Sequence, residues 1–154
     1  MPNVLSENST PKKLLKNDEI APMYFEPKVN HRFYVTINDE NGKEIIPSFI
    51  IRSTTVPNLY YTWYGRRKYE PLTIQVYNPI VPSATACIYK ALTNKAKWNI
   101  TIDILGPVGD KIEEWTIADA KVKSVKFSDL SWQNSGDSSF AEITFKISDV
   151  SVVT

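Results

Sequence analysis

The stretch ADAKVKSVKFSDLSWQNSGDSSFAEITFKISDVSV, residues 118–152, decides the fold. Apolar and polar side chains alternate over 118–128 and again over 138–153, which is the pattern of half-buried β-strands. The Ser- and Asn-rich loop 128–137 joins the two segments. In the first segment the inward positions change from Ala120 and Val122 to Val125 and Phe127, and we predict a β-bulge near Lys123–Ser124 that absorbs this change. In the final strand Ala141, Ile143, Phe145 and Ile147 face one way, and Val150 and Val152 face the other.

Further strands are expected upstream of this stretch. The clearest is Trp98–Ile104, where Trp98, Ile100, Ile102 and Ile104 alternate with polar residues. Others are predicted at 31–38, 44–53, 72–77 and 111–117, with a short one around 61–64. The first two of these should pair as an antiparallel hairpin, with Phe49 and Ile51 on one face of the second. Pro47 lacks a backbone donor and should therefore lie at an edge or bulge.

One helix interrupts the strands, predicted at about 83–95. Ser83 can cap its start, and Ala84, Ile88, Ala91 and Leu92 recur at helical spacing beside Cys87. Seven or so strands with this one inserted helix predict a mostly antiparallel β-barrel or β-sandwich.

Residues 1–30 differ from the rest and are predicted to be an N-terminal arm or extension preceding a β domain at 31–154. They hold Pro2, Pro11, Pro22 and Pro27 and show little apolar periodicity. Two interpretations stand side by side. The segment is either a disordered tail or an arm that orders against a neighbouring subunit, with Tyr24 and Phe25 as the residues that it buries.

The composition argues against several classes of function. A formal net charge of +1 over 154 residues does not suit a dedicated nucleic-acid binder. Cys87 and His31 are the single residues of their kinds, so an intrachain disulfide is impossible and a four-ligand zinc site is nearly excluded. Glu113 and Glu114 are adjacent and point to opposite faces of a strand. We therefore expect no catalytic site, metal or cofactor, and no signal peptide or membrane insertion.

The loop 54–71 is the strongest candidate for a binding surface, because it places five aromatic residues within ten positions beside a basic cluster. Such a loop is either a satellite core or a protein-binding surface, and it would also suit single-stranded nucleic acid. The residues predicted to form a subunit interface are Tyr24, Phe25, Pro57, Tyr60, Tyr61, Trp63, Tyr64, Arg66, Arg67 and Tyr69.

Taken in order, these segments resemble the tail tube proteins of contractile-tailed phages, which are related to the inner tube proteins of contractile injection systems. The resemblance lies in HRFYVTIND at 31–39, IIPSFIIRSTTVPNL at 45–59, GRRKYEPLTIQVYN at 65–78, the helix after Pro82, and 118–152. It covers about 31–153. The N-terminal extension is longer than the minimal family pattern needs.

The resemblance implies a structural virion protein, made in the host cytoplasm, that assembles with itself. Its protomers would close into hexameric rings and stack into a tail tube through which double-stranded DNA passes without sequence-specific binding. Sheath, baseplate and tail terminator proteins would be its other partners. A baseplate tube-initiator ring and an injection-system inner tube are close alternatives. Candidate lumen-lining groups are Thr73/Gln75, Asn99/Thr101/Asp103, Lys121/Lys123 and Glu142/Thr144/Lys146.

Two hypotheses of a different class remain open from the residues alone. One is a monomeric β-sandwich that binds carbohydrate, with Trp63 and its Tyr neighbours as the platform. The other is an oligonucleotide-binding barrel. The state of association separates them, because only the tube protein should form rings or tubes.

Overall fold

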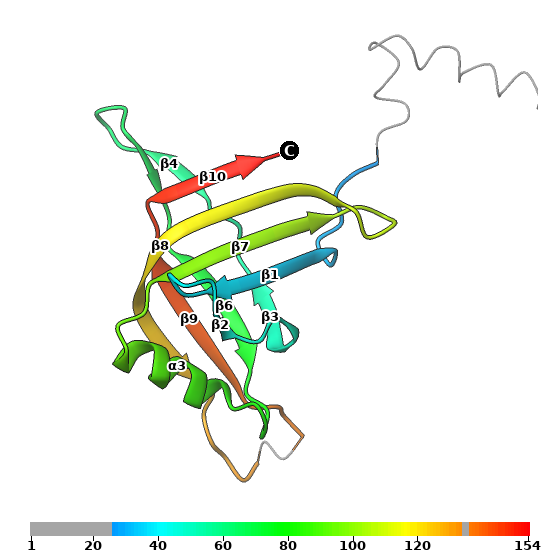
Figure 1. Ribbon diagram of the computed structural model, residues 1–154, viewed down its shortest axis with the longest axis vertical. Coiled ribbons are helices and arrows are strands. Elements are labelled where there is room, and N and C mark those ends of the chain that lie inside the picture. The colour runs from blue at the N-terminus through cyan, green and yellow to red at the C-terminus, as the bar shows by residue number, and fades with distance from the viewer. Residues whose placement is uncertain (1–25, 134–135) are drawn as a thin grey trace, which may run out of the picture.

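A computed structural model describes residues 26–133 and 136–154 of the chain (Figure 1). Residues 1–25 of the predicted arm, which include Tyr24 and Phe25, lie outside the described residues. The elements, in chain order, are β1 (Phe33–Asn38), β2 (Glu44–Ile46), the 3-10 helix η2 (Ser48–Ile50), β3 (Ile51–Thr54), β4 (Leu59–Tyr61), β5 (Arg67–Tyr69), β6 (Leu72–Tyr77), α3 (Ala84–Thr93), β7 (Trp98–Leu105), β8 (Lys111–Phe127), β9 (Phe140–Lys146) and β10 (Asp149–Val153).

The strands form two antiparallel layers that share β8. Their order is β2-β1-β7-β8-β9-β6-β3, with β10 also on β8, and β4-β5 makes a separate two-stranded sheet. Residues 111–120 of β8 pair with β7, and residues 121–127 pair with β9 (Figure 1). The order does not close into a ring within the described residues. The mostly antiparallel β fold with an inserted helix is thus confirmed, in its open, two-layered form.

The predicted bulge explains how one strand serves two layers. The β8–β9 register shifts between Val122 and Ser124, at the position expected from the change of parity. The pattern at 111–128, interpreted from the sequence as two strands, forms this one long strand instead. The change of parity resembles a break between two strands, and the residue pattern alone does not show that β8 continues through it.

The final segment contains two strands, β9 and β10, where one was expected. Both lie along the same edge of β8, since Lys146 pairs with Lys121 and Asp149 pairs with Ala118. Only residues 147–148 interrupt the ladder, and Ile147 turns into the core there. The expected alternation of β9 is confirmed, because Ala141, Ile143 and Phe145 are buried.

Pro47 breaks the segment 44–53 that the sequence predicted as one strand. Ser48–Ile50 turns as a 3-10 helix after Pro47, and this turn leaves Phe49 77% exposed rather than facing inward. β2 pairs with β1 as expected, but β3 crosses to the other layer and pairs with β6. The missing backbone donor of proline accounts for the break.

The core lies between the layers and is filled mainly by branched aliphatic side chains. Ile37, Ile74 and Ile100 are fully buried, and the rings of Trp98 and Phe145 lie 5.3 Å apart. Helix α3 closes one side. The Ser83 side chain accepts a bond from Ala86 N–H at its start, and Ala84, Ile88 and Ala91 are buried. Leu92, predicted on the apolar face, is instead 41% exposed.

Candidate subunit interfaces

The β4–β5 hairpin is the feature of the protomer that most needs a partner. Tyr60 pairs with Lys68 and Tyr61 pairs with Arg67, and in the described chain no third strand joins them. A two-stranded hairpin alone in water is marginally stable. The sequence predicted a short strand around 61–64, but residues 62–65 form the turn of this hairpin, between the strands 59–61 and 67–69.

Local hydrogen bonds keep the turn of this hairpin in shape. Thr62 N–H donates to Arg66 O at 2.9 Å, and Arg66 N–H donates to Thr62 Oγ1 at 3.0 Å. Gly65 has φ +81°, a left-handed conformation that glycine adopts without strain. At the base, Glu70 N–H donates to Asn58 O and Thr55 N–H donates to Thr73 O, both at 2.9 Å. The turn is thus held by its backbone and by Thr62, whereas its aromatic side chains take no part.

The aromatic side chains of the hairpin point into solvent. Trp63 is 95% exposed and stacks edge-on against Tyr64, with ring centroids 5.2 Å apart. Leu59, Tyr60 and Tyr61 are also exposed. Two predicted interface residues lie elsewhere: Pro57 is buried inside the protomer, and Tyr69 packs partly against the core. The interface role of the exposed residues stays a prediction.

A basic hollow of about 670 Å³ lies beside the hairpin. Arg66, Arg67 and Lys68 line it together with Lys146, and the hydroxyl-bearing Tyr60, Tyr69 and Ser148 complete the wall with Ile147. The hollow therefore contains four cationic side chains and no carboxylate among its lining residues.

A second exposed surface, not predicted from the sequence, lies at the β8–β9 connection. Leu130 is 94% exposed and Trp132 is fully exposed. A hollow of about 400 Å³ is lined there by Lys126, Phe127, Ser128, Asp129, Leu130, Ser131, Asp137, Ser138, Ser139, Phe140 and Glu142. The available signal was an apolar pair, Leu130 and Trp132, in a loop otherwise rich in Ser and Asp.

Hydrogen bonds at the base of this loop fix it to the ends of β8, β9 and β6, which are neighbours in one layer. Ser128 N–H donates to Phe140 O at 3.0 Å, and Phe140 N–H donates to Ser128 Oγ at 3.2 Å. Asn78 N–H donates to Ser139 O at 3.0 Å, which brings the 78–83 connection, with exposed Ile80 and Val81, to the same end. This end of the protomer thus carries apolar groups without cover from the described chain.

The β6–β9–β8 layer presents one polar surface away from the core. Ser124 pairs with Thr144, which pairs with Thr73, and Lys126 pairs with Glu142, which pairs with Gln75. Lys121 and Lys146 form the next pair along. Most of the sequence-predicted lumen groups are therefore neighbours, whereas Asn99, Thr101 and Asp103 lie in the other layer.

Two of the polar groups in that other layer, Asn99 and Asp103, face groups of the same protomer. Asn99 Nδ2 donates to Asp39 O, and Asn99 Oδ1 accepts from Asp119 N–H. Asp103 is only 8% exposed and lies 3.5 Å from Lys111 Nζ, which also binds Glu114 at 2.6 Å. Desolvation raises the pKa of Asp103 above its ordinary value, although the nearby Lys111 charge opposes this.

Several strand edges lack a paired strand in the part of the chain that the structure describes. β7 begins at Trp98, opposite Ala120, so residues 121–127 of β8 have a strand neighbour only in β9. β10 pairs with β8 alone, and β2 and β3 are the ends of the strand order. Unpaired edges of this kind invite pairing with another chain.

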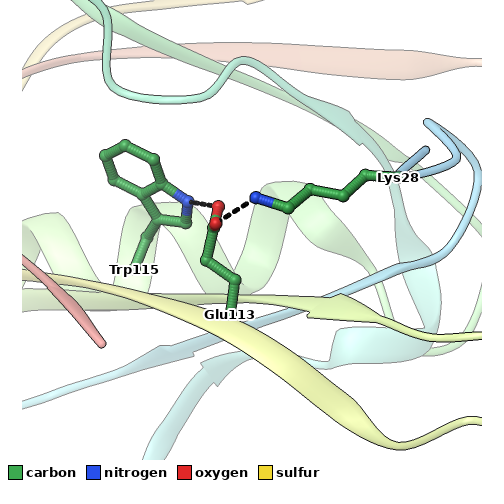
Figure 2. A network of polar contacts seen from close by, with 3 residues as sticks. All are labelled: Lys28, Glu113 and Trp115. Atoms are coloured by element: carbon green, nitrogen blue, oxygen red, sulfur yellow. Dashed lines mark hydrogen bonds and ion pairs between the residues drawn. The ribbon is translucent and has the colours of Figure 1, made fainter. Parts of the chain in front are cut away.

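An ion pair ties the start of the described chain to β8. Lys28 Nζ binds the Glu113 carboxylate, which also accepts a bond from Trp115 Nε1 at 2.7 Å (Figure 2). The bond from Lys28 lowers the pKa of Glu113. Residue 28, within the predicted arm, is thus held at the β7–β8 end of the protomer.

No constellation for catalysis emerges among residues 26–133 and 136–154. No group of three or more His, Cys, Asp or Glu side chains there is placed to hold a metal ion. His31 is exposed before β1, whereas Cys87 is half-buried on α3 against the core. The described part also has no helix of the length and apolarity needed to cross a membrane.

Comparison with known proteins relates the chain to others by its fold. Neither a protein-family model nor a curated protein sequence matches it. Solved structures do: a chain of the sheath/tube terminator of the PVC extracellular contractile injection system has a TM-score of 0.60 at 19% identity, covering 84% of this chain and 99% of that one. A chain of the anti-feeding prophage baseplate gives 0.59 at 15% identity, covering 84% and 97%. Hcp1 from E. coli EAEC 042 gives 0.58 at 14% identity, covering 79% and 90%. The tail-tube-like fold expected from the sequence is confirmed by these similarities.

Proposed function

We propose that this chain is a structural protomer that assembles with itself into rings, and that the rings stack into a hollow tube. The observation that carries the proposal is the β4–β5 hairpin, a two-stranded sheet that projects exposed aromatic residues without cover from residues 26–133 and 136–154. Exposed Tyr and Trp side chains are the groups that protein interfaces bury most often. The unpaired strand edges and the fold shared with contractile injection system chains support the same function.

The bore of the tube is formed by the polar surface of the β6–β9–β8 layer in this proposal. Hydroxyl and amide groups stand there beside Lys121, Lys126, Glu142 and Lys146. Such a surface lets a charged polymer pass without holding it, because it offers no continuous basic track. Rings of six protomers in a phage tail would pass double-stranded DNA, and rings in an injection system would pass another cargo. Sheath, baseplate and terminator proteins are the partners that either particle requires.

The state of association of the full chain tests this function directly. We expect mass photometry to detect closed rings and negative-stain electron microscopy to detect rings or tubes with a central hole. A protein that stays monomeric from nanomolar to millimolar concentration would refute the proposal. Binding to a carbohydrate array by such a monomer would instead support the carbohydrate-binding alternative.

A further inference from the structure

A cationic surface continues from the hollow beside the hairpin onto the polar β6–β9–β8 layer. The wall of the hollow contains four cations, which are Arg66, Arg67, Lys68 and Lys146. Lys146 ends β9, and its cross-strand partner is Lys121 of β8. We propose that these five side chains, called the basic site below, bind the phosphate backbone of a nucleic acid. This inference deepens the proposed function, because it names the class of polymer that the bore contacts.

The two lysines of the basic site form a like-charge contact that an anion would relieve. Residues directly opposite each other on antiparallel strands have Cβ atoms about 4.5–5.5 Å apart, and like charges at such positions are destabilising. Lys121 and Lys146 are exposed and point away from the core, because the next pair along, Val122 with Phe145, packs into it. Among residues 26–133 and 136–154 neither lysine forms an ion pair. The protomer thus carries an unfavourable contact that a bound phosphate would make favourable.

The cations that the hairpin contributes are also without carboxylate partners in the described part of the chain. Arg66, Arg67 and Lys68 are exposed, and none of them takes part in an ion pair there. The residues that line the hollow include no carboxylate. Since the whole chain has a formal net charge of only +1, the excess of positive charge is a local property of this surface.

The chemistry of the basic site suits phosphate groups. The planar guanidinium groups of Arg66 and Arg67 can each donate two parallel hydrogen bonds to a phosphate. Tyr60, Tyr69 and Ser148 line the same hollow, and their hydroxyl groups can donate to phosphate oxygens. Duplex DNA carries one negative charge per about 1.7 Å of its axis, so it can engage several neighbouring cations at once. Contacts to phosphates carry no sequence information, and we therefore expect binding that is independent of sequence.

The basic site occupies only one end of the polar layer, which reconciles contact with passage. Further along the layer the next outward pair joins two hydroxyl groups, Ser124 with Thr144, and the pair after it joins opposite charges, Lys126 with Glu142. The Glu142 carboxylate also accepts a bond from Gln75 Nε2 at 3.4 Å. A nucleic acid in the bore would therefore be contacted at one level of each ring and meet weaker attraction over the rest.

The binding of duplex DNA to the full chain tests the basic site. The probe is a fluorescein-labelled duplex of about 20 base pairs, and anisotropy gives the Kd at salt concentrations from about 50 to 200 mM. If the five cations each neutralise one phosphate, log K should fall with log salt at a slope of about −4.5 for one bound protomer. This slope corresponds to a loss of about 500-fold in affinity over that range of salt.

The decisive variant is Lys121→Gln/Lys146→Gln. Loss of two phosphate contacts should make the slope shallower by about 1.8 and weaken binding at 0.1 M salt by at least about tenfold. The same variant should unfold at a higher urea concentration than the unmodified chain in low salt without DNA, because the like-charge contact is gone. A site that weakens the fold and strengthens binding gives both changes together, whereas a purely structural role of the lysines gives no change in slope.

The matched control is Lys43→Gln/Lys90→Gln, which removes the same two charges. These exposed lysines line a different hollow, which Asp39, Glu40 and Glu44 also line. We expect the control to keep the slope and the affinity of the unmodified chain. Circular dichroism verifies that each variant is folded.

Three outcomes would overturn the basic site while leaving the proposed function intact. The first is a chain that forms rings but does not bind the duplex at 50 mM salt. The second is an equal loss of affinity in the control and in the Lys121→Gln/Lys146→Gln variant. The third is tighter binding of a polyglutamate peptide than of a duplex of equal charge, which would assign the surface to an acidic protein. A chain that binds the duplex through these lysines but never forms rings would instead overturn the proposed function and leave the site.

Discussion

Removal of two aromatic side chains from the hairpin, Trp63→Ser with Tyr64→Ser, should separate assembly from folding. Neither ring takes part in the hydrogen bonds of the turn, which join Thr62 with Gly65 and Arg66. Trp63 is 95% exposed and contacts its neighbour Tyr64 edge-on. Changes at exposed positions that are not caps, glycines, prolines or strained backbone positions cost within about 0.5 kcal/mol of stability. We therefore expect the double variant to unfold at nearly the same denaturant concentration as the unmodified protomer.

Assembly should respond far more strongly than folding. A Trp or Tyr side chain buries roughly 150–250 Å² at an interface, which at about 25 cal/mol per Å² gives a gross stabilisation of about 4–6 kcal/mol each. Ordering of side chains and loss of rigid-body freedom offset much of this. Interface aromatics nevertheless commonly retain about 2 kcal/mol or more. A loss of about 2 kcal/mol per contact raises the concentration needed for assembly about 30-fold.

The assay is the protein concentration at which sedimentation first recovers tubes, measured for the double variant and for a matched control. Tyr89→Ser is that control, because Tyr89 is an exposed aromatic on α3 and lies outside the hairpin. We expect the control to assemble like the unmodified chain. Tubes from the folded double variant at the unmodified concentration would refute the assignment of the hairpin to an interface.

The remaining predictions concern stability and the N-terminal segment. Phe145→Ala should destabilise the protomer by about 3–5 kcal/mol and lower its Tm by roughly 10 °C in calorimetry, because the ring is fully buried. Cys87→Ala should cost about 1–2 kcal/mol in urea unfolding and leave tubes intact. The bond from Lys28 lowers the pKa of Glu113, so the ionised carboxylate stabilises the fold above its ordinary pKa, and this stabilisation is lost as the pH falls through the lowered pKa. Glu113→Gln should therefore lower the free energy of unfolding by at most about 1 kcal/mol at pH 7 and should have no effect in strong acid. Deletion of residues 1–20 should shorten tubes in electron micrographs without changing the unfolding midpoint, and unchanged tube lengths would contradict this.

The strands and the helix were predictable because local patterns determine them. The alternation of apolar and polar residues at Trp98–Ile104 and at 72–77 predicts which side chains are buried in the core. Ser83 acts as the expected cap, and the parity change at 122–124 identifies the bulge. These signals are local, and the tertiary structure does not override them.

Partner choice among strands could not be predicted, because it depends on residues far apart in the chain. Ile51 pairs with Val76 although the sequence favoured pairing with the first strand, and the reason is the turn that Pro47 introduces. Likewise, no local pattern shows that 111–128 is one strand serving two layers. The bulge indicates a bend in the strand. Whether the strand continues through the bend depends on the strands that pair with each half of it, which are β7 and β9.

The candidate interface could be predicted only in part, because some of its residues depend on contacts between distant parts of the chain. The density of aromatic residues in 54–71 is a local signal, and Trp63 and Tyr64 are exposed as an interface requires. Burial of Pro57 and partial burial of Tyr69 depend on how the base of the hairpin meets the core, which the residue pattern does not specify. The β8–β9 loop gives only a weak signal in the sequence, because Leu130 and Trp132 are the only large apolar residues in 128–137.

The distribution of charge shows what a net value conceals. A formal charge of +1 argues against nucleic-acid binding over the whole chain, yet four cations line the hollow beside the hairpin, whereas three carboxylates and one lysine line the hollow at the β8–β9 connection. Exposed charges are screened with a Debye length of about 10 Å at 0.1 M salt and about 3 Å at 1 M. If subunit contacts use the four cations of the hairpin hollow, assembly measured by sedimentation should therefore weaken as salt rises. Contacts made only by strand edges and by exposed apolar groups such as Trp63 should instead persist at 1 M salt.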